Sequence, residues 1–517
     1  METFAPDTQI HKCALIKSWS VIMIMAFCGY MSYSKTLHCD GEFFYVESGR
    51  DTLYENMGYP INSPSDDYDP MISATGESFF FTSTRGEDRH ERIYISSRIM
   101  SGWSTPKQIK LSSVLSNVGS PFISYDNTQL YFTQCSYGGS CDIYRAVKSG
   151  DSWRVELVGR PISTRRHWEA HPSLSPDGRR LFFSSIRRGG KGGKDIYMSR
   201  RTLRGWSSPV PLNDINTSGD EVSPYIHIDG RTLYFSSDGY DDGYGKLDFY
   251  VCRIDEYGKC SDIRNMGTSI NDSSEQYSIR TSRDGRVGYY ATNSYEGGSG
   301  GLDIYRYELE KEGRATPTSI LLGKIKNTEN REVMYAAVYI DAIPVPLVTI
   351  TGSKYISIMG DTPMIHLQCT AAGYMPYDTL LYPNTSSQVM YHDIILRPIK
   401  IGARYKLNSI HFSTDVYTLD SVSMRQVERL AVFMMENPSV EIDVEGHTDS
   451  RGGESYNFLL SSRRANSIVE ALVAFGVDSS RMRAVPYGDT RPLSSSDDEM
   501  SMALNRRCEI LVRQYSP

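Results

Sequence analysis

The apolar and polar positions of this chain follow different rhythms along its length. Between residues 42 and 312, short alternating stretches end at Asp-Gly or Asp-Asn and lead into aromatic stretches such as Leu181-Phe182-Phe183-Ser184-Ser185. Alternation with a period of two predicts half-buried strands, and Asp-Gly is a tight hairpin signal. Residues 316–398 add further short apolar runs, and residues 405–515 alternate between strand and helix patterns. We therefore expect a multidomain protein with two β-rich regions followed by an α/β domain.

One triplet recurs five times across the first region. Its copies are Arg92-Ile93-Tyr94, Asp142-Ile143-Tyr144, Asp195-Ile196-Tyr197, Asp248-Phe249-Tyr250 and Asp303-Ile304-Tyr305. The tyrosines lie 50, 53, 53 and 55 residues apart, and a hairpin block precedes the triplet, most clearly at His171-Pro172-Ser173-Leu174-Ser175-Pro176-Asp177-Gly178. Four short strands in a unit of about 50 residues are typical of a β-propeller blade.

The two ends of this region indicate how the ring closes. The fifth unit has no Trp strand after Tyr305, whereas residues 44–63 look like the tail of a blade. Asn62 precedes Pro70 by 8 residues, the same spacing as Asn216 to Pro224. We infer that the N-terminal segment supplies the outer strand of the last blade, which predicts five blades, with six as the alternative. Over residues 42–312 the repeats resemble TolB-like β-propeller repeats, which implies a binding scaffold rather than a reaction.

The first 34 residues have the pattern of a targeting segment. Lys12 and Lys17 precede the apolar stretch Trp19–Phe27, as in a secretory signal peptide. Met25-Ala26-Phe27-Cys28 resembles a lipobox with Cys28 as the lipidated residue, although Phe27 departs from that pattern. The alternative is ordinary cleavage after Ser34. Both alternatives predict an exported chain.

Two cysteine pairs flank predicted turns. Cys135 and Cys141 lie six residues apart, and Cys252 and Cys260 lie eight apart. An exported protein meets an oxidising environment, so we expect the disulfides Cys135–Cys141 and Cys252–Cys260, with four free thiols as the alternative. No CxxC pair with zinc spacing is present in the sequence, and we expect no metal and no cofactor.

Residues 316–398 have no propeller pattern and predict a small β-sandwich of five to seven short strands. Gly323-Lys324-Ile325, Ala336-Ala337-Val338-Tyr339-Ile340 and Ala372-Gly373-Tyr374-Met375-Pro376 resemble the carboxypeptidase regulatory-like domain. The resemblance implies a spacer without catalysis.

Three sequence blocks stand out between residues 405 and 515. Gly446-His447-Thr448-Asp449 follows an alternating strand, Asn457, Leu460 and Arg464 lie on a predicted helix over about 455–475, and Asn505-Arg506-Arg507 precedes a last strand. In this order the blocks resemble the OmpA C-terminal peptidoglycan-binding domain. The resemblance implies an α/β fold whose ligand is the diaminopimelate of the peptidoglycan stem peptide.

The resemblance also implies roles for individual side chains. Asp449 takes the ligand's ammonium, and Arg464 takes its carboxylate, for which the planar guanidinium offers two parallel bonds. The spacing of Asn457, Leu460 and Arg464 places them on one helix face. With Thr448 and Arg507, these residues form the expected diaminopimelate site. We interpret His447 as a structural histidine.

Composition narrows the classes of function. The chain has 517 residues, 39% hydrophobic and 23% charged, which suits packed domains better than disorder or a multi-span membrane protein. Its 55 basic and 62 acidic residues give a net charge of −7, so no binding to nucleic acid is expected. The sequence holds no HExxH and no serine motif in its required context, so we expect no enzyme activity.

The order of signal segment, propeller, sandwich and OmpA-like domain resembles the PorE-type lipoprotein of the type IX secretion system, without its helical repeats. This predicts a non-enzymatic protein on the periplasmic face of the outer membrane that binds peptidoglycan and presents its propeller to an outer-membrane or secretion complex. The alternatives are a general outer-membrane tether unrelated to secretion and an exported hydrolase with a wall-targeting domain.

Overall fold

The computed structural model describes residues 54–516 with short internal gaps at 112–116, 137, 151, 165–166, 296, 342–346, 361, 384–387, 408–409, 411, 413–415 and 497. The expected targeting segment 1–34 and Cys28 lie outside the described residues. None of the helices in the described part is long and apolar enough to cross a membrane.

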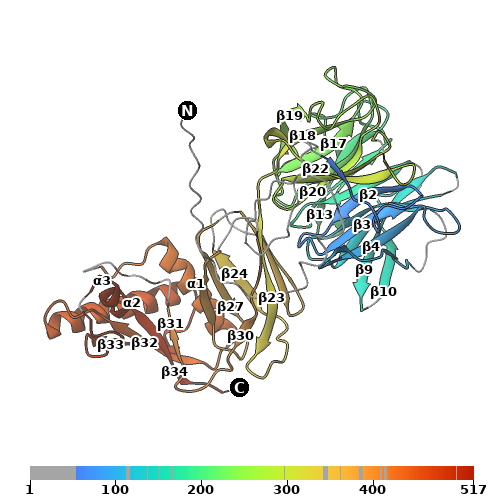
Figure 1. The fold of residues 1–517 in the computed structure, drawn as a ribbon. Helices are drawn as coiled ribbons and strands as arrows, with labels where there is room; N and C mark the ends of the chain where they lie inside the picture. The colour runs from blue at the N-terminus through green and yellow to red at the C-terminus, as the bar shows by residue number, and fades with distance from the viewer. Residues whose placement is uncertain are drawn as a thin grey trace, which may run out of the picture. The chain divides into compact units, whose positions relative to one another are not determined.

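Five antiparallel sheets follow one another within the described residues from Tyr54 to Glu308, in a propeller-like series (Figure 1). The first sheet contains β2 (Asp67–Ile72), β3 (Ser78–Ser83), β4 (Arg92–Ile99), β5 (Gly102–Trp103) and β6 (Lys107–Gln108), and the second contains β7 (Val118–Ile123), β8 (Gln129–Cys135), β9 (Cys141–Ser149) and β10 (Ser152–Leu157). The third contains β11 (Glu169–Leu174), β12 (Arg180–Ser185), β13 (Asp195–Thr202), β14 (Gly205–Trp206) and β15 (Val210–Pro211). The fourth contains β16 (Glu221–Ile226), β17 (Thr232–Ser237), β18 (Asp248–Ile254) and β19 (Cys260–Asn265). Each recurring triplet starts at the first or second residue of the third strand of its sheet.

The fifth sheet contains strands from both ends of the series. Its order is β1 (Tyr54–Asn56), β22 (Asp303–Glu308), β21 (Val287–Thr292) and β20 (Tyr277–Thr281). In the pairing of β1 with β22, Tyr54 lies opposite Tyr307 and Asn56 lies opposite Tyr305. The prediction that the N-terminal segment supplies the outer strand of the last sheet is therefore confirmed. A short 3-10 helix at Lys311–Gly313 follows.

The first strand of every sheet contains a bulge, and the bulged residues share a conformation. Five non-glycine residues at equivalent positions have φ between 49° and 57°: Asp69, Ser120, His171, Ser223 and Ser278. Ser120 and Ser278 both donate through their hydroxyls to Asp69, and the Oγ of Ser278 lies 3.2 Å from that of Ser223, whose hydroxyl can donate to it. These bonds link four of the five sheets through one buried polar centre.

In three of the sheets an asparagine side chain bonds to the third strand just beyond the end of the outer strand. Each donates to a backbone carbonyl and accepts from the N–H of the same residue over 2.8–3.1 Å: Asn62 with Ile304, Asn216 with Ile196, and Asn271 with Phe249. The equal spacing of Asn62 and Asn216 from the next proline reflects this shared role.

We predict that Asn216→Ala destabilises the protein by about 1–3 kcal/mol, because the buried N–H of Ile196 loses its acceptor. Denaturant unfolding of the full chain measures the change. Asn213→Ala is the matched control, because Asn213 is exposed in the same loop. Equal stability of the two variants would contradict the role given to Asn216.

The two expected disulfides differ in outcome. Cys135 and Cys141 lie directly opposite each other on β8 and β9 and are joined, with a Cα–Cα distance of 4.0 Å. Cys252 and Cys260 are free and buried, so the structure contradicts the second disulfide. The register explains the difference, because the residue opposite Cys260 is Ile254 rather than Cys252.

Residues 319–396 form two facing sheets around a shared apolar core. The first contains β23 (Ser319–Asn327), β25 (Leu347–Thr351), β26 (Lys354–Met359), β29 (Val389–Tyr391) and β30 (Ile394–Leu396). The second contains β24 (Ala337–Asp341), β27 (Ile365–Thr370) and β28 (Tyr377–Leu381). Alternating residues such as Leu321 and Ile325 of β23 and Leu367 and Cys369 of β27 are fully buried in that core.

A histidine lies between two carboxylates on the second sheet. His366 contacts Asp378 at 2.9 Å and Asp341 at 3.7 Å and is 5% exposed, and Asp341 also accepts bonds from Arg429. Burial alone would lower the pKa of His366, but its bonds to Asp341 and Asp378 outweigh burial and raise the pKa to about 9.

The raised pKa predicts a pH dependence of stability. The charged histidine stabilises the fold fully below its unfolded pKa of about 6.5, and this contribution, about 2–3 kcal/mol, is lost as the pH rises through 9. Thermal unfolding of wild type and His366→Gln should therefore differ most near pH 6 and least near pH 9.5. A difference that grows with pH would refute the assignment.

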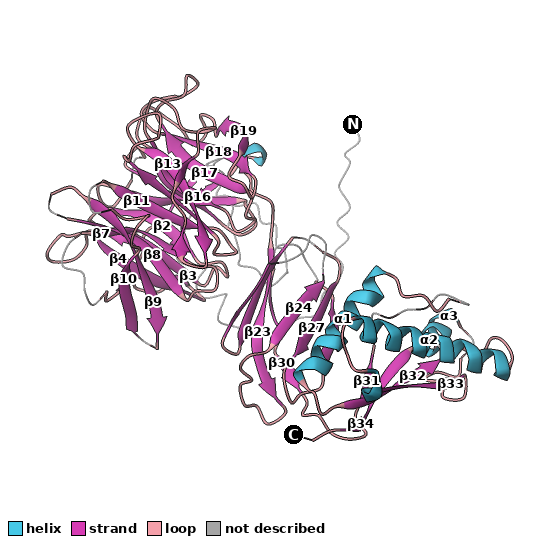
Figure 2. Cartoon of the chain, turned by 180° about the vertical axis from the view of Figure 1, so that it is seen from behind, coloured by secondary structure: helices cyan, strands magenta, loops and turns pink. Residues whose placement is uncertain are grey.

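The C-terminal domain is a mixed sheet covered by helices (Figure 2). The sheet order is β31 (Arg404–Lys406), β34 (Cys508–Gln514), β32 (Glu441–His447) and β33 (Met482–Gly488), and β32 runs parallel to β33. The helices are α1 (Ser421–Glu436), α2 (Glu454–Ala474) and α3 (Glu499–Asn505), with a 3-10 turn at Ser479–Arg481. Buried residues such as Val427 and Leu430 of α1 and Ala465 and Ile468 of α2 pack on the sheet. The predicted helix 455–475 agrees with α2 to within one residue.

Candidate functional site

The site begins where β32 ends, between β33 and β34. The backbone N–H of His447 donates to Arg507 at 3.0 Å, and that of Thr448 donates to Gly488 at 2.9 Å. The next residue, Asp449, is therefore held in the loop between β32 and α2. The middle of α2 is fixed to the end of β33, because the Ser461 hydroxyl accepts a bond from the N–H of Gly488 at 3.0 Å.

Gly446 sets the distance between β32 and α2. A Cβ atom at this position would lie 2.2 Å from the carbonyl oxygen of Ser461, which is far closer than van der Waals contact. Only glycine allows helix and strand to approach this closely, and the approach brings the polar face of α2 over the end of β32.

A cavity of about 470 Å³ lies between this loop and α2. It is lined by Thr448, Asp449, Arg451, Gly452, Tyr456, Asn457, Leu460, Arg464 and Arg506. Five of the six residues expected from the sequence line it together: Thr448, Asp449, Asn457, Leu460 and Arg464. The sixth, Arg507, does not line it.

Asp449 accepts bonds from two guanidiniums. Its Oδ2 lies 2.6 Å from Nη2 of Arg451 and 2.9 Å from Nη1 of Arg506, and its Oδ1 accepts from the backbone N–H of Arg451 at 3.1 Å. Burial raises the pKa of Asp449, but the bonds from Arg451 and Arg506 outweigh it, so the pKa lies below its usual value. Asp449 is therefore an anion at neutral pH.

Arg464 is buried, with 1% of its surface exposed. Its Nε donates to the carbonyl of Val416 at 3.0 Å, its Nη1 lies 3.5 Å from that of His447, and the guanidinium lies 4.9 Å from the Phe412 ring centre. Burial lowers the pKa of Arg464, but arginine stays protonated at neutral pH. The domain thus holds a buried cation at the wall of the cavity.

Two further polar groups of the cavity wall are unsatisfied. The Oδ1 atom of Asn457 and the hydroxyl of Thr448 are buried and lack hydrogen-bond partners. The Asn457 amide is oriented by a bond from its Nδ2 to the Asp449 carbonyl at 3.4 Å, which leaves Oδ1 as an acceptor. Buried polar groups without partners are rare in folded proteins, and here both border the same cavity.

The prediction for Arg507 is not supported by its position. Its Nε pairs with Glu509 at 2.5 Å, and its Nη2 donates to the Arg491 carbonyl at 3.2 Å. The neighbouring Arg506, at the C-terminal cap of α3, faces the cavity instead. Arg451 and Tyr456 are further lining residues that sequence reasoning missed. The only available signal was the position of Arg451 two residues after Asp449.

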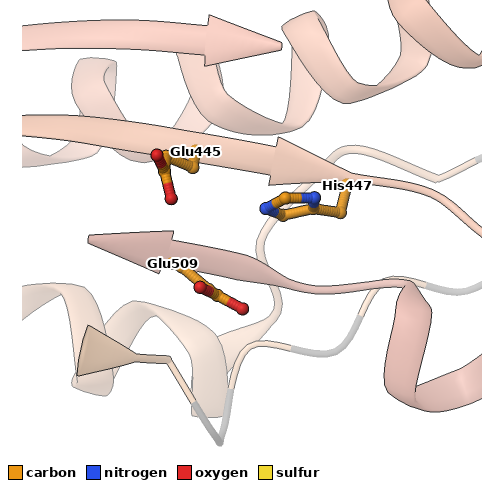
Figure 3. A group of neighbouring side chains, drawn as sticks. All are labelled: Glu445, His447 and Glu509. Carbon is orange, nitrogen blue, oxygen red and sulfur yellow. The ribbon is translucent and has the colours of Figure 1, made fainter. Parts of the chain in front are cut away.

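Glu445, His447 and Glu509 form a separate group beside the cavity (Figure 3). They project from the neighbouring strands β32 and β34, and one potential ligand atom from each lies within 4.8 Å of the others. Both carboxylates are already paired, Glu445 with Arg404 at 3.1 Å and Glu509 with Arg507. His447 stacks on Tyr487, and burial lowers its pKa to about 4. A cation could bind here only by releasing a guanidinium, so we assign no metal to this group.

We predict that Gly446→Ala destabilises the domain by about 3 kcal/mol, because α2 must move away from β32. Gly453→Ala is the matched control, since a Cβ at that helix cap meets no atom within 4 Å, and its cost should stay below about 1 kcal/mol. Denaturant unfolding measures both variants. Equal effects would show that the close approach at Gly446 is unimportant.

Known proteins resemble the chain mainly in this domain. The OmpA family matches residues 411–506. The peptidoglycan-associated lipoprotein of Pasteurella multocida is 32% identical over 102 residues, which cover 20% of this chain and 68% of that protein. Outer membrane porin F of Pseudomonas fluorescens is 39% identical over 115 residues, or 22% of this chain and 35% of the porin. The chain thus spans about a third of the porin's length.

Two solved structures match parts of the chain. The peptidoglycan-associated lipoprotein from Burkholderia pseudomallei is 31% identical and covers 20% of this chain and 86% of its own, with a TM-score of 0.19. TolB from Acinetobacter baumannii is 18% identical and covers 48% of this chain and 56% of its own, with a TM-score of 0.33. Scores this low add nothing to the fold described above. On the identity and coverage of the Pasteurella multocida lipoprotein, the chain belongs to the OmpA family, through residues 411–506.

Proposed function

We propose that residues 405–515 bind peptidoglycan by holding the free end of diaminopimelate in the stem peptide. The observation that carries this proposal is that Asp449 and Arg464 line one cavity of about 470 Å³. The ligand end carries an ammonium and a carboxylate, so it needs an anion and a cation a short distance apart. The relatives named peptidoglycan-associated lipoproteins support peptidoglycan as the polymer that is bound.

The roles of the side chains follow from their charges. Asp449 receives the ammonium, and the unsatisfied Oδ1 of Asn457 is a second acceptor for its N–H groups. Arg464 receives the carboxylate, and the unsatisfied Thr448 hydroxyl is a donor close by. Leu460 supplies apolar contact for the ligand's methylene groups. The cavity is thus suited to binding charged groups, and we propose that the protein is a binding protein rather than an enzyme.

The remainder of the chain defines the wider role that we propose. An exported chain, held at the periplasmic face of the outer membrane, would tether that membrane to the wall. Its propeller-like part would be the platform for an outer-membrane complex, with the type IX secretion complex as our first candidate. A tether unrelated to secretion is the alternative. Lipidation of Cys28 would supply the membrane attachment directly, whereas cleavage after Ser34 would leave that attachment to a partner protein.

We predict that the full chain co-sediments with sacculi that contain diaminopimelate, and that Asp449→Ala and Arg464→Ala each weaken binding about 10-fold or more, because each removes a charge-assisted bond. Arg463→Ala is the matched control, because Arg463 is exposed on α2 next to Arg464. Sacculi with lysine in place of diaminopimelate lack the side-chain carboxylate and should bind as weakly as the Arg464 variant does. Unchanged sedimentation of both site variants would refute the proposed site.

A further inference from the structure

One buried residue of the propeller-like part departs from the repeat. Two residues after the bulge with positive φ, the first strands of the five sheets contain Met71, Phe122, Ser173, Tyr225 and Arg280. All five side chains are buried, with at most 2% of their surface exposed. The first four are uncharged, and the fifth is a guanidinium. A buried charge without an ion pair is costly, so the fold alone gives no reason for an arginine at this position.

Arg280 has few partners within the part of the chain that the structure describes. Its Nη1 donates to the carbonyl of Ile279 at 2.9 Å, and its guanidinium lies 5.1 Å from the ring centre of Tyr225. Its Nε is buried and has no hydrogen-bond partner. Among the described residues, no group accepts a bond from Nη2 and no carboxylate pairs with the guanidinium. Buried polar atoms without partners are rare, and those of a cation are the most costly.

The guanidinium lies at the centre of the ring of sheets. Burial lowers the pKa of Arg280, and the ionisable groups that act on it are Asp69 of the first sheet, Tyr225 of the fourth and Tyr125, which follows β7 of the second. His171 of the third sheet interacts with both Asp69 and Arg280. Groups from all five sheets thus surround one position. The Asp69 carboxylate does not pair with the guanidinium, because it is held by the two serine hydroxyls described above.

The edge of Arg280 that lacks partners is the edge that suits a carboxylate. Nε and Nη2 carry two nearly parallel N–H groups, which match the two oxygens of a carboxylate. Arg404 uses this edge to bind Glu445, over 3.1 and 3.2 Å. Arg483 uses it to bind Asp443, over 3.0 and 2.7 Å. In Arg280 the same edge meets no acceptor among the described residues.

His171 offers a further donor on the more exposed side of Arg280. Its side chain is half-buried, and its Nδ1 is buried without a partner. Burial lowers the pKa of His171 to about 4, so the ring is neutral and one of its nitrogens carries a hydrogen. The ring lies 5.4 Å from that of Trp168, and Nζ of Lys194 lies 5.5 Å from the same indole. Exposure falls from Lys194 through His171 to Arg280, so an anion that enters here passes donors at each step.

We propose that the centre of the propeller-like part binds a free carboxylate group, which takes the Nε–Nη2 edge of Arg280 and has His171 as a further donor. The carboxylate belongs either to a small organic acid or to the C-terminal end of a partner peptide, and its chemistry at Arg280 is the same in both. This site is separate from the peptidoglycan cavity, so the inference does not rest on the proposed function.

Thermal unfolding of the full chain, followed by tryptophan fluorescence, tests the proposal. Four of the five tryptophans lie in the propeller-like part, so the signal reports on that part: Trp103, Trp153, Trp168 and Trp206. Sodium acetate at about 0.1 M should raise the melting temperature by about 2–4 °C over sodium chloride at the same concentration, because only the folded state binds the carboxylate. Acetyl-trialanine with a free C-terminal carboxylate, compared with its amide, tests the end of a peptide chain.

Three variants assign the effect. Arg280→Met should abolish the rise, and without acetate it should be at least as stable as wild type, because Met71 fills the equivalent position and a buried charge is removed. Arg280→Lys keeps a cation without the forked donor edge and should lose most of the rise. Arg286→Met is the matched control, because Arg286 is exposed in the turn after β20, and it should respond as wild type does.

A rise with either probe that depends on Arg280 supports the proposal. Acetate alone indicates a small organic acid, and the peptide acid without its amide indicates a chain end. If neither probe acts more strongly than chloride, or if the rise persists in Arg280→Met or Arg280→Lys, the proposal is wrong. A large loss of stability in Arg280→Met would show that the arginine serves the fold, and this result would also overturn the proposal.

Discussion

The ion cluster of Asp449 with Arg451 and Arg506, beside the buried Arg464, is the interaction on which the C-terminal domain depends. The guanidiniums repel one another, so the backbone must hold them in place. Three features do so: the pairing of Thr448 with Gly488, the close approach at Gly446, and the anchoring of Arg464 on backbone carbonyls. The packing of the domain therefore maintains the shape of a cavity that is charged and contains polar groups without hydrogen-bond partners.

In the propeller-like part, by contrast, many buried polar groups are satisfied by hydrogen bonds within the fold. At its centre, the carboxylate of Asp69 is satisfied by serines from other sheets, and at the sheet edges Asn62 and Asn216 satisfy backbone groups. These bonds are internal and leave the connecting turns at the surface. A scaffold of this kind can change its turns without losing its sheets, which suits a surface that meets a partner.

Much of this arrangement could be predicted because it is local or repeated. The triplets ending at Tyr94 and Tyr305, and the equal spacing of Asn62 and Asn216, indicated the sheets and their closure, since each repeat forms the same contacts. The line-up of Asn457, Leu460 and Arg464 followed from helical periodicity.

The failures have a common cause, which is register and chain direction at the ends of elements. The turn between β18 and β19 places Cys260 opposite Ile254 rather than Cys252, and the spacing of the two cysteines does not reveal where the strands end and the turn begins. The last turn of α3 decides that Arg506 rather than Arg507 faces the cavity. Arg451 lies in an irregular loop, where the sequence has no periodicity from which its position could be predicted.

The pairing of β1 with β22 has a mechanical meaning. In a chain held at a membrane on its N-terminal side and at the wall on its C-terminal side, tension would enter at Tyr54 and leave after Glu308, on neighbouring strands. The pull would cross a single seam of hydrogen bonds, and the sheets between would carry almost no load. Under force the ring would thus open between β1 and β22, while its other sheets keep their shape.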